Sequence, residues 1–168
     1  MITLEAFKSY WDTYLTHPDI EKVVVGDIDD LIAIADKLQP TEAPVLFVSF
    51  PFRDSTPVNE AEASWEELSL LVTIYDIPST SPRVKEADKK IQCLSKIEPI
   101  IKAVYTKFYY DCNYSETYPF GMEAWTDWRT KGPNPSNPIT TKKFHGWSFG
   151  VDLKINDVIP YDESLWQQ

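Results

Sequence analysis

Residues 145–159 alternate apolar and polar side chains more regularly than any other part of the chain. In the sequence HGWSFGVDLKINDVI, every second residue from Trp147 to Ile155 is apolar, and the residues between them are small or polar. Because successive side chains of a strand point to opposite faces, this pattern predicts a β-strand with one buried face. The chain must therefore build a sheet whose last strand lies near its C-terminus, directly after a segment rich in proline and lysine.

Three other segments are also predicted to be strands. In VLFVSFPF (45–52) and WEELSLLVTIYDI (65–77), every second side chain is apolar over at least four positions. Pro51 cannot donate a hydrogen bond to a neighbouring strand, so we expect an edge or a bulge at that end of the first segment. After Gly121, residues 122–128 alternate more weakly and predict a strand that forms a hairpin with 145–155.

Two helices are predicted before the first of these strands. Thr3 is a suitable N-cap for a helix with Phe7 and Trp11 on its apolar face, and Pro18 ends that helix. Asp27, in the sequence GDIDD, is a suitable N-cap for a second helix with Leu31 on its apolar face. These aspartates resemble part of a calcium loop, but helix capping explains them without a metal.

The segment from Ser81 to Tyr110 predicts the longest helix of the chain. Ser81 is a candidate N-cap, Pro82 suits the first helical position, and Pro99 should kink the helix by removing a backbone hydrogen bond. The predicted apolar stripe is Val84, Ala87, Ile91, Leu94, Ile97, Ile101, Val104 and Phe108. At 1.5 Å per residue the stripe is about 40 Å long, which exceeds the width of a small sheet.

These elements predict an α+β fold in one domain. A chain of 168 residues with 43% hydrophobic residues can bury one sizeable core. We expect a four-stranded, mainly antiparallel sheet, with the N-terminal helices and the one long kinked helix packed on one face. Within the single domain 1–168, an extended hairpin arm is expected at about 130–144 and a C-terminal tail at 156–168.

The arm and the tail contain the candidate interaction residues. The arm, KGPNPSNPITTKK, combines prolines with lysines, and the tail contains apolar side chains that a free terminus seldom exposes. Such a tail either folds back onto the core or docks on a neighbour. The residues predicted to interact are Lys131, Pro133, Pro135, Pro138, Lys142, Lys143, Tyr161, Leu165 and Trp166.

The charge distribution excludes some partners. The formal net charge is −10, and residues 1–80 contain 15 Asp/Glu but only 4 Lys/Arg. An acidic half of this kind releases no counterions from phosphates, so sequence-specific nucleic-acid binding is not expected. No apolar run of about 18 residues predicts a membrane span. With two cysteines and no signal peptide before Thr3, we expect reduced thiols and synthesis in the cytoplasm.

The sequence offers little catalytic chemistry. His17 and His145 are the only histidines, and we interpret both as surface or capping residues. Cys93 is predicted to be buried in the long helix and Cys112 to be exposed, and neither has the paired spacing of a zinc site. Motifs for an activated serine or a phosphate-binding loop are absent from the sequence. We therefore predict no enzyme activity, metal or cofactor.

The order of the predicted helices and strands resembles that of one known protein family, and this resemblance suggests a function. The N-terminal helix, the strand pair VLFVSFPF and ELSLLVTIYDI, the long helix SPRVKEADKKIQCLSKIEPIIKAVYTKF and the closing strand GWSFGVDLKI resemble the tail-terminator and tail-completion proteins of tailed phages. The resemblance implies a homo-oligomeric ring, commonly a hexamer, that binds tail-tube or neck proteins in a virion assembled in the host cytoplasm. It implies no catalytic residues and no cofactor.

Two other function classes stay open. An acidic, aromatic-rich surface also suits an inhibitor or immunity-type protein that blocks a basic partner. A carboxylate-dependent hydrolase would need two acids brought together in an enclosed pocket. A ring-forming protein should run as a multimer, whereas an inhibitor should stay monomeric until a basic partner is added.

Overall fold

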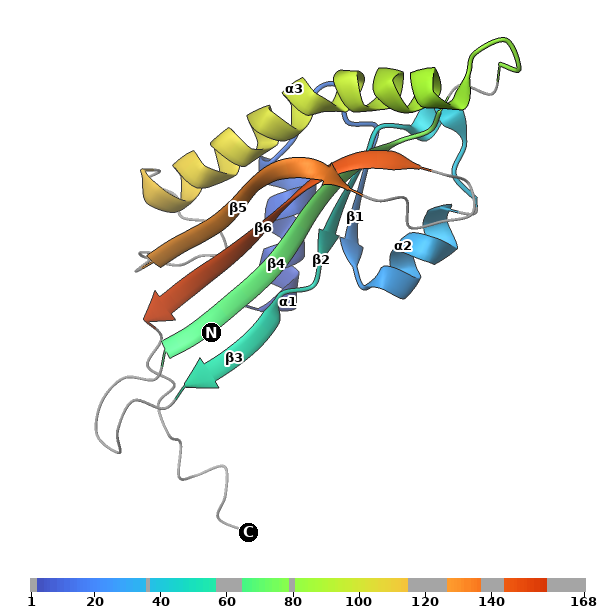
Figure 1. Cartoon of the computed structure of the whole chain (residues 1–168). Helices are drawn as coiled ribbons and strands as arrows, with labels where there is room; N and C mark the ends of the chain where they lie inside the picture. Colours follow the sequence, from blue (N-terminus) through green and yellow to red (C-terminus); the bar gives the residue numbers. More distant parts are fainter. Residues whose placement is uncertain are drawn as a thin grey trace.

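A six-stranded mixed sheet lies at the centre of the fold, in the order β1–β2–β4–β6–β5, with β3 paired to β4 beyond the end of β2 (Figure 1). The computed structural model describes residues 3–35, 37–56, 65–78, 81–114, 127–136 and 144–156. The strands are β1 (Lys22–Gly26), β2 (Val45–Ser49), β3 (Phe52–Thr56), β4 (Trp65–Asp76), β5 (Asp127–Ser136) and β6 (His145–Asn156). The helices are α1 (Leu4–Ser9), α2 (Ile28–Ala35) and α3 (Glu86–Asn113), with a π-helical turn at Tyr10–Tyr14 and a 3-10 turn at Pro40–Glu42.

The predicted α+β class and the mainly antiparallel sheet are confirmed, and the described chain contains six strands where four are expected. Of the predicted strand 122–128, only residues 127 and 128 belong to β5, and residues 122–126 lie outside the described ones. Among the described strands, β1 and β2 are the one parallel pair, and the other pairs are antiparallel. β1 is an additional strand, formed by the short valine run before α2. The segment 45–52 divides at Pro51 into β2 and the start of β3, because proline cannot continue a ladder.

One face of the sheet carries the main core, and α1 and α3 cover it (Figure 1). Most of the apolar residues predicted to line this face of β4 and β6 are buried, including Phe149, Val151 and Leu153, whereas Trp147 is half-buried and the side chain of Ile155 lies outside the described ones. An aromatic group joins the N-terminus to α3: the Trp11 and Phe108 ring centroids are 4.8 Å apart, and those of Tyr10 and Phe108 are 5.7 Å apart. Contacts between buried aromatic rings stabilise a fold by more than the burial of their apolar area alone.

The other face of the sheet carries a smaller core. Val24, Phe47 and Tyr75 point to this side, because strand side chains alternate, and Leu31 of α2 packs against them. The N-terminal helices therefore do not share one face: α1 packs with α3, whereas α2 covers the opposite face near the β1 edge. The prediction of one shared face is wrong because β1 lies between the two helices in the chain. After α1 the chain enters the sheet as β1, and it leaves β1 on the opposite face to form α2.

The N-caps predicted for the first two helices, Thr3 and Asp27, are confirmed. The hydroxyl of Thr3 accepts a hydrogen bond from the Ala6 backbone N–H at 3.1 Å. The Asp27 carboxylate accepts the backbone N–H groups of Asp29 and Asp30 at 2.9 Å, and Asp30 accepts the Asp27 N–H at 3.0 Å. A Cβ at Gly26 would collide with the Asp30 side chain, so this cap needs glycine at position 26. Asp27 and Asp30 of GDIDD are therefore capping residues, as predicted.

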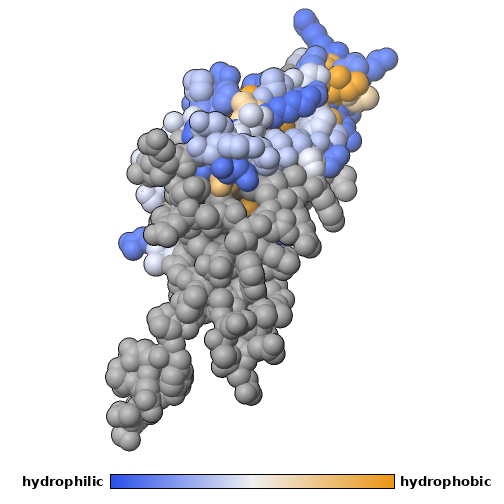
Figure 2. Space-filling view, turned by 90° about the vertical axis from the view of Figure 1, so that its left-hand side faces the viewer, coloured by the Kyte–Doolittle hydropathy of each residue, from blue (hydrophilic) through white to orange (hydrophobic). Residues whose placement is uncertain are grey.

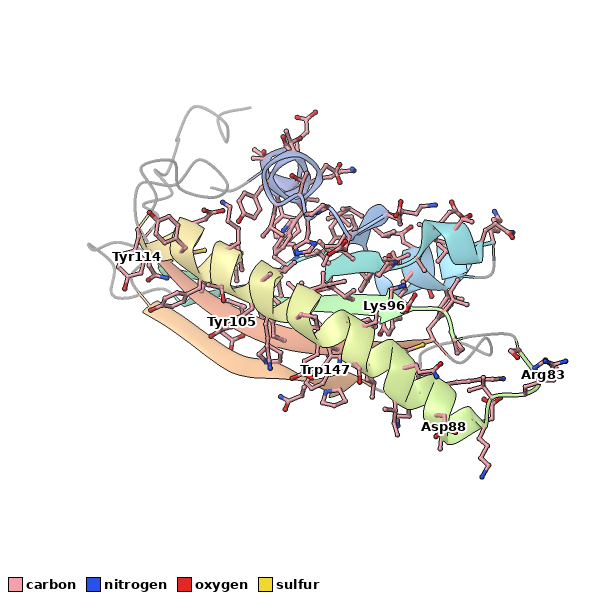
Figure 3. All side chains as sticks on the ribbon, turned by 90° about the horizontal axis from the view of Figure 1, so that it is seen from above. Arg83, Asp88, Lys96, Tyr105, Tyr114 and Trp147 are labelled. Atoms are coloured by element: carbon pink, nitrogen blue, oxygen red, sulfur yellow. The ribbon has the colours of Figure 1, made fainter. Side chains whose placement is uncertain are left out.

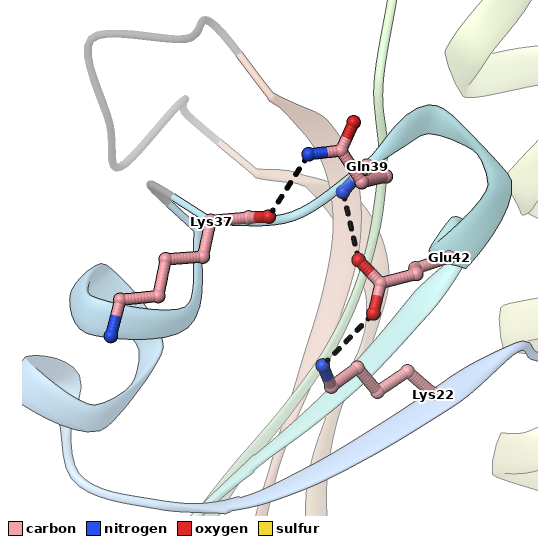
Figure 4. Close-up of polar contacts among 4 residues, drawn as sticks. All are labelled: Lys22, Lys37, Gln39 and Glu42. Carbon is pink, nitrogen blue, oxygen red and sulfur yellow. Dashed lines mark hydrogen bonds and ion pairs between the residues drawn. The ribbon is translucent and has the colours of Figure 1, made fainter.

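The loop between α2 and β2 is tied to the sheet edge by one glutamate (Figure 4). The Glu42 carboxylate accepts the Gln39 backbone N–H at 2.8 Å and pairs with the Lys22 ammonium of β1 at 3.3 Å. The hydrogen bond from Gln39 and the contact with Lys22 lower the pKa of Glu42 below its ordinary value. The edge strand β1 is thereby joined to the turn that precedes its neighbour β2.

The long helix begins later than predicted and is not buried along its whole stripe. Ser81 forms a turn, in which its hydroxyl accepts the Arg83 N–H at 3.4 Å, and α3 starts only at Glu86 after Lys85 as its N-cap. The helix continues through Pro99. From Cys93 to Cys112 the side facing the sheet is buried, but Ala87 and Ile91 are exposed, so the predicted apolar stripe extends beyond its core.

Candidate functional site

The predicted arm is partly a strand. Residues 130–136 belong to β5, where Lys131 lies opposite Gly150 and Pro135 opposite Trp147. Proline is tolerated here because β5 is an edge strand, and the register shifts between Lys131 and Asn134, around Pro133. The expectation of an arm that starts at about 130 is therefore wrong for residues 130–136, which pair with their own β6.

The other predicted interaction residues lie outside the described residues. These are Pro138, Lys142 and Lys143 between β5 and β6, and Tyr161, Leu165 and Trp166 in the tail. Among the predicted set, the structure thus brings together Lys131, Pro133 and Pro135 on one edge strand. Their predicted role in interaction stays a prediction.

An exposed apolar surface lies where α3 passes over the β5 edge. The Trp147 indole N–H donates a hydrogen bond to the Leu94 carbonyl at 2.9 Å, which fixes the half-buried tryptophan against the helix (Figure 3). Pro135 lies opposite Trp147, so both side chains are on the sheet face that α3 covers. Ala87 is exposed one turn before Ile91, whose side chain is 60% exposed. We call Ala87, Ile91, Leu94, Pro135 and Trp147 the α3 apolar surface.

Positive charge borders this surface. Residues 83–107 contain seven Lys/Arg and three Asp/Glu, a net charge of +4. Lys89 and Lys102 pair with Glu86 and Glu98 on the same helix. Arg83, Lys85 and Lys90 are exposed and form no ion pair with another described residue, and we call them the α3 cations. Figure 2 shows apolar side chains flanked by hydrophilic ones at the upper end of the molecule, the height of the first turns of α3 in Figure 1.

The opposite edge of the sheet is acidic. Asp27, Asp29 and Asp30 are all exposed at the start of α2, beside β1. Two isoleucines of α2 are also exposed, Ile28 and Ile32. Because β1 and β5 are the two ends of the strand order, the acidic side chains and the α3 apolar surface lie towards different edges of the molecule.

A buried polar cluster lies under α3 and was missed from the sequence. The Asp76 carboxylate pairs with the Lys96 ammonium at 3.0 Å, and Asp76 lies opposite His145 in the sheet. His145 is buried, so its interpretation as a surface or capping residue is wrong. Cys93 is buried as predicted, and burial together with the Asp76 charge raises its pKa to about 11. Such a thiol stays protonated at neutral pH and is a poor nucleophile.

A second buried carboxylate joins the two ends of the main core. Asp111 accepts the Tyr10 hydroxyl at 2.8 Å and forms an ion pair with Lys107. Burial, followed by the Asp111 charge, raises the pKa of Tyr10 above its ordinary range. Cys112 is buried beside this pair, which contradicts its predicted exposure, and burial also raises its pKa. This arrangement holds the turn after α1 to the end of α3, and the raised pKa keeps the Cys112 thiol protonated at neutral pH.

A pocket of about 410 Å³ lies between α3 and the segments that precede β1 and β2. Two of its polar lining groups are already engaged: the His17 ring nitrogen accepts the Asp19 backbone N–H at 3.2 Å, and Lys96 pairs with Asp76. The other lining residues are Pro18, Glu21, Ala43, Pro44, Pro99 and Ile100. Within the described ranges, no group of His, Cys, Asp and Glu is placed to hold a metal ion.

No protein-family model and no curated protein matches this chain. None of the helices that the structure describes is long and apolar enough to cross a membrane. The described residues thus show a contrast between an exposed apolar surface, whose bordering cations form no ion pair with another described residue, and buried polar groups engaged within the fold.

Proposed function

We propose that this protein is a structural assembly subunit that associates with copies of itself. The observation that carries this proposal is the α3 apolar surface, where Ile91 and half-buried Trp147 are bordered by cations that form no ion pair with another described residue. Exposed apolar residues with aromatic anchors and a charged border are the features of a protein interface.

The charge distribution favours a contact between two different surfaces of the subunit, one basic and one acidic. The α3 cations and the acidic start of α2 lie towards different edges of the sheet, so a contact between two copies can pair a basic surface with an acidic one. A head-to-tail contact of this kind closes into a ring when the rotation between subunits allows.

The more specific proposal is a ring that ends or joins a tubular particle. It rests on the order of elements, which resembles that of phage tail-terminator and neck proteins. In that role the subunit would belong to a virion and would contact tail-tube or neck proteins through the faces of the ring. It would need no cofactor and no catalytic residue.

Sedimentation velocity on the purified chain tests the proposal. We expect a species larger than the 19.4 kDa monomer, and a shift towards monomer when the salt concentration rises from 0.05 to 0.5 M, since charge pairs at a surface are screened by salt. A monomer at every concentration would reject self-association. A monomer that binds a basic partner protein would instead support the inhibitor alternative.

A further inference from the structure

We propose that the α3 apolar surface binds the C-terminal tail, residues 157–168, of a second copy of this chain. The inference rests on the proposed self-association and names the two segments that meet. Each subunit would donate its tail to one neighbour and receive the tail of another, which is a head-to-tail contact.

The surface offers complementary features to such a tail. Ile91 and Ala87 project from α3 next to Leu94, and Trp147 and Pro135 extend the apolar area onto β6 and β5. The α3 cations lie on the same end of the helix. A ligand for this surface therefore needs apolar side chains to cover the isoleucine and tryptophan, together with negative charge.

The tail has both properties. The sequence DVIPYDESLWQQ contains three acids and no lysine or arginine. Its large apolar residues include Tyr161, Leu165 and Trp166, of the types that serve as interface anchors. Of the other segments outside the described residues, 137–143 is basic, whereas 115–126 also combines aromatic residues with acids but joins α3 to β5 and so is anchored at both ends.

Chain length favours a tail from a second copy. The tail begins after Asn156, whereas Trp147 lies nine residues earlier on β6, a distance of about 30 Å along the strand. Tyr161 is five residues beyond Asn156 and can reach at most about 17 Å from it. Trp166 could return to its own Trp147 only in a fully extended tail, and Tyr161 could not reach it at all, so the two side chains cannot both lie on this surface of their own subunit.

Two variants of the full-length chain remove one partner each. Ile91→Glu places an acid on the surface, and Trp166→Ala removes the anchor from the tail. We expect each to weaken self-association at least tenfold, as truncation of an interface anchor usually does. Tyr110→Glu is the matched control, because Tyr110 is also a large exposed residue of α3, 54% accessible, but lies near the other end of that helix. At a protein concentration low enough for the wild type to be monomeric, thermal unfolding should be unchanged in all three.

Mixing the two variants tests whether the contact is made between copies. Ile91→Glu keeps an intact tail, and Trp166→Ala keeps an intact surface, so an equimolar mixture should form dimers that neither variant forms alone. A synthetic peptide of residues 157–168 should also dissociate the wild-type oligomer, and a peptide with alanine at positions 161 and 166 should not.

The outcomes separate this inference from the proposed function. If the wild-type chain assembles and both variants assemble equally well, the tail contact is wrong while self-association stands. If neither variant assembles alone and their mixture does not assemble either, the tail does not bind the α3 apolar surface of a neighbouring copy. If the wild-type chain is monomeric at every concentration, both proposals fall.

Discussion

Replacement of Phe108 by alanine tests the packing that holds the N-terminal segment to α3. The Phe108 ring is fully buried and lies 4.8 Å from the Trp11 ring centroid and 5.7 Å from that of Tyr10. Removing a buried phenylalanine costs about 3–5 kcal/mol, and the two ring contacts, worth about 0.5–1.5 kcal/mol each, place this site in the upper half of that range. We expect a loss of about 4 kcal/mol in the free energy of unfolding.

Urea denaturation followed by tryptophan fluorescence measures this loss. With a denaturant dependence of about 2 kcal/mol per molar urea, the midpoint should fall by about 2 M. Tyr110→Ala is the matched control on the same helix, because Tyr110 is 54% exposed, and a surface substitution should change stability by about 0.5 kcal/mol or less. If Phe108→Ala shifts the midpoint no more than Tyr110→Ala does, the aromatic group does not hold the N-terminus to α3.

Three further predictions concern other parts of the fold. Val151→Asp should unfold the domain, because it buries an unpaired charge in the main core, and a native circular dichroism spectrum at 25 °C would contradict this. Asp27→Ala should lower the free energy of unfolding by about 1 kcal/mol through loss of the α2 cap; an unchanged urea midpoint would show that the cap contributes nothing. The Cys93 pKa is raised from 9.0 to about 11, so its stabilising contribution is present below pH 9 and is lost as the pH rises through 11. Between pH 8 and pH 10.5 the wild type should therefore lose roughly 1–2 kcal/mol more stability than Cys93→Ala, and equal losses would refute the assignment.

Elements with a strong local signal were predictable from the sequence. The alternation in β6 and β4 and the caps at Thr3 and Asp27 each depend on residues within a few positions of one another. β1 was missed because its valine run is buried or half-buried on both sides and so lacks a period of two. The start of α3 was placed too early, since the Ser81–Pro82 signal is satisfied by a turn rather than by a helix.

Contacts between distant segments could not be read from the sequence. Cys112 is buried at the end of α3, where its neighbour Asp111 accepts a hydrogen bond from Tyr10. Tyr10 lies 101 residues earlier in the chain, so no local pattern indicates this burial. The pairing of Asp76 with Lys96, and the burial of His145 opposite Asp76, depend on how α3 crosses β4 and β6.

The candidate surface did leave a signal in the sequence. The apolar stripe of the long helix is longer than a small sheet is wide, and its excess falls at Ala87 and Ile91, which are exposed. A helical stripe that extends beyond the core it covers points to a second apolar partner. The apolar residues of the tail, Tyr161, Leu165 and Trp166, are visible in the sequence. The distance between the start of the tail and Trp147 is not, because it depends on β6 being an extended strand from His145 to Asn156.

Native mass spectrometry of the full-length chain tests the central claim most directly, because it counts subunits. Self-association through unlike surfaces predicts one dominant closed oligomer whose mass is a whole multiple of 19.4 kDa, together with its loss on Ile91→Glu substitution. A single 19.4 kDa species across micromolar protein concentrations would contradict the claim.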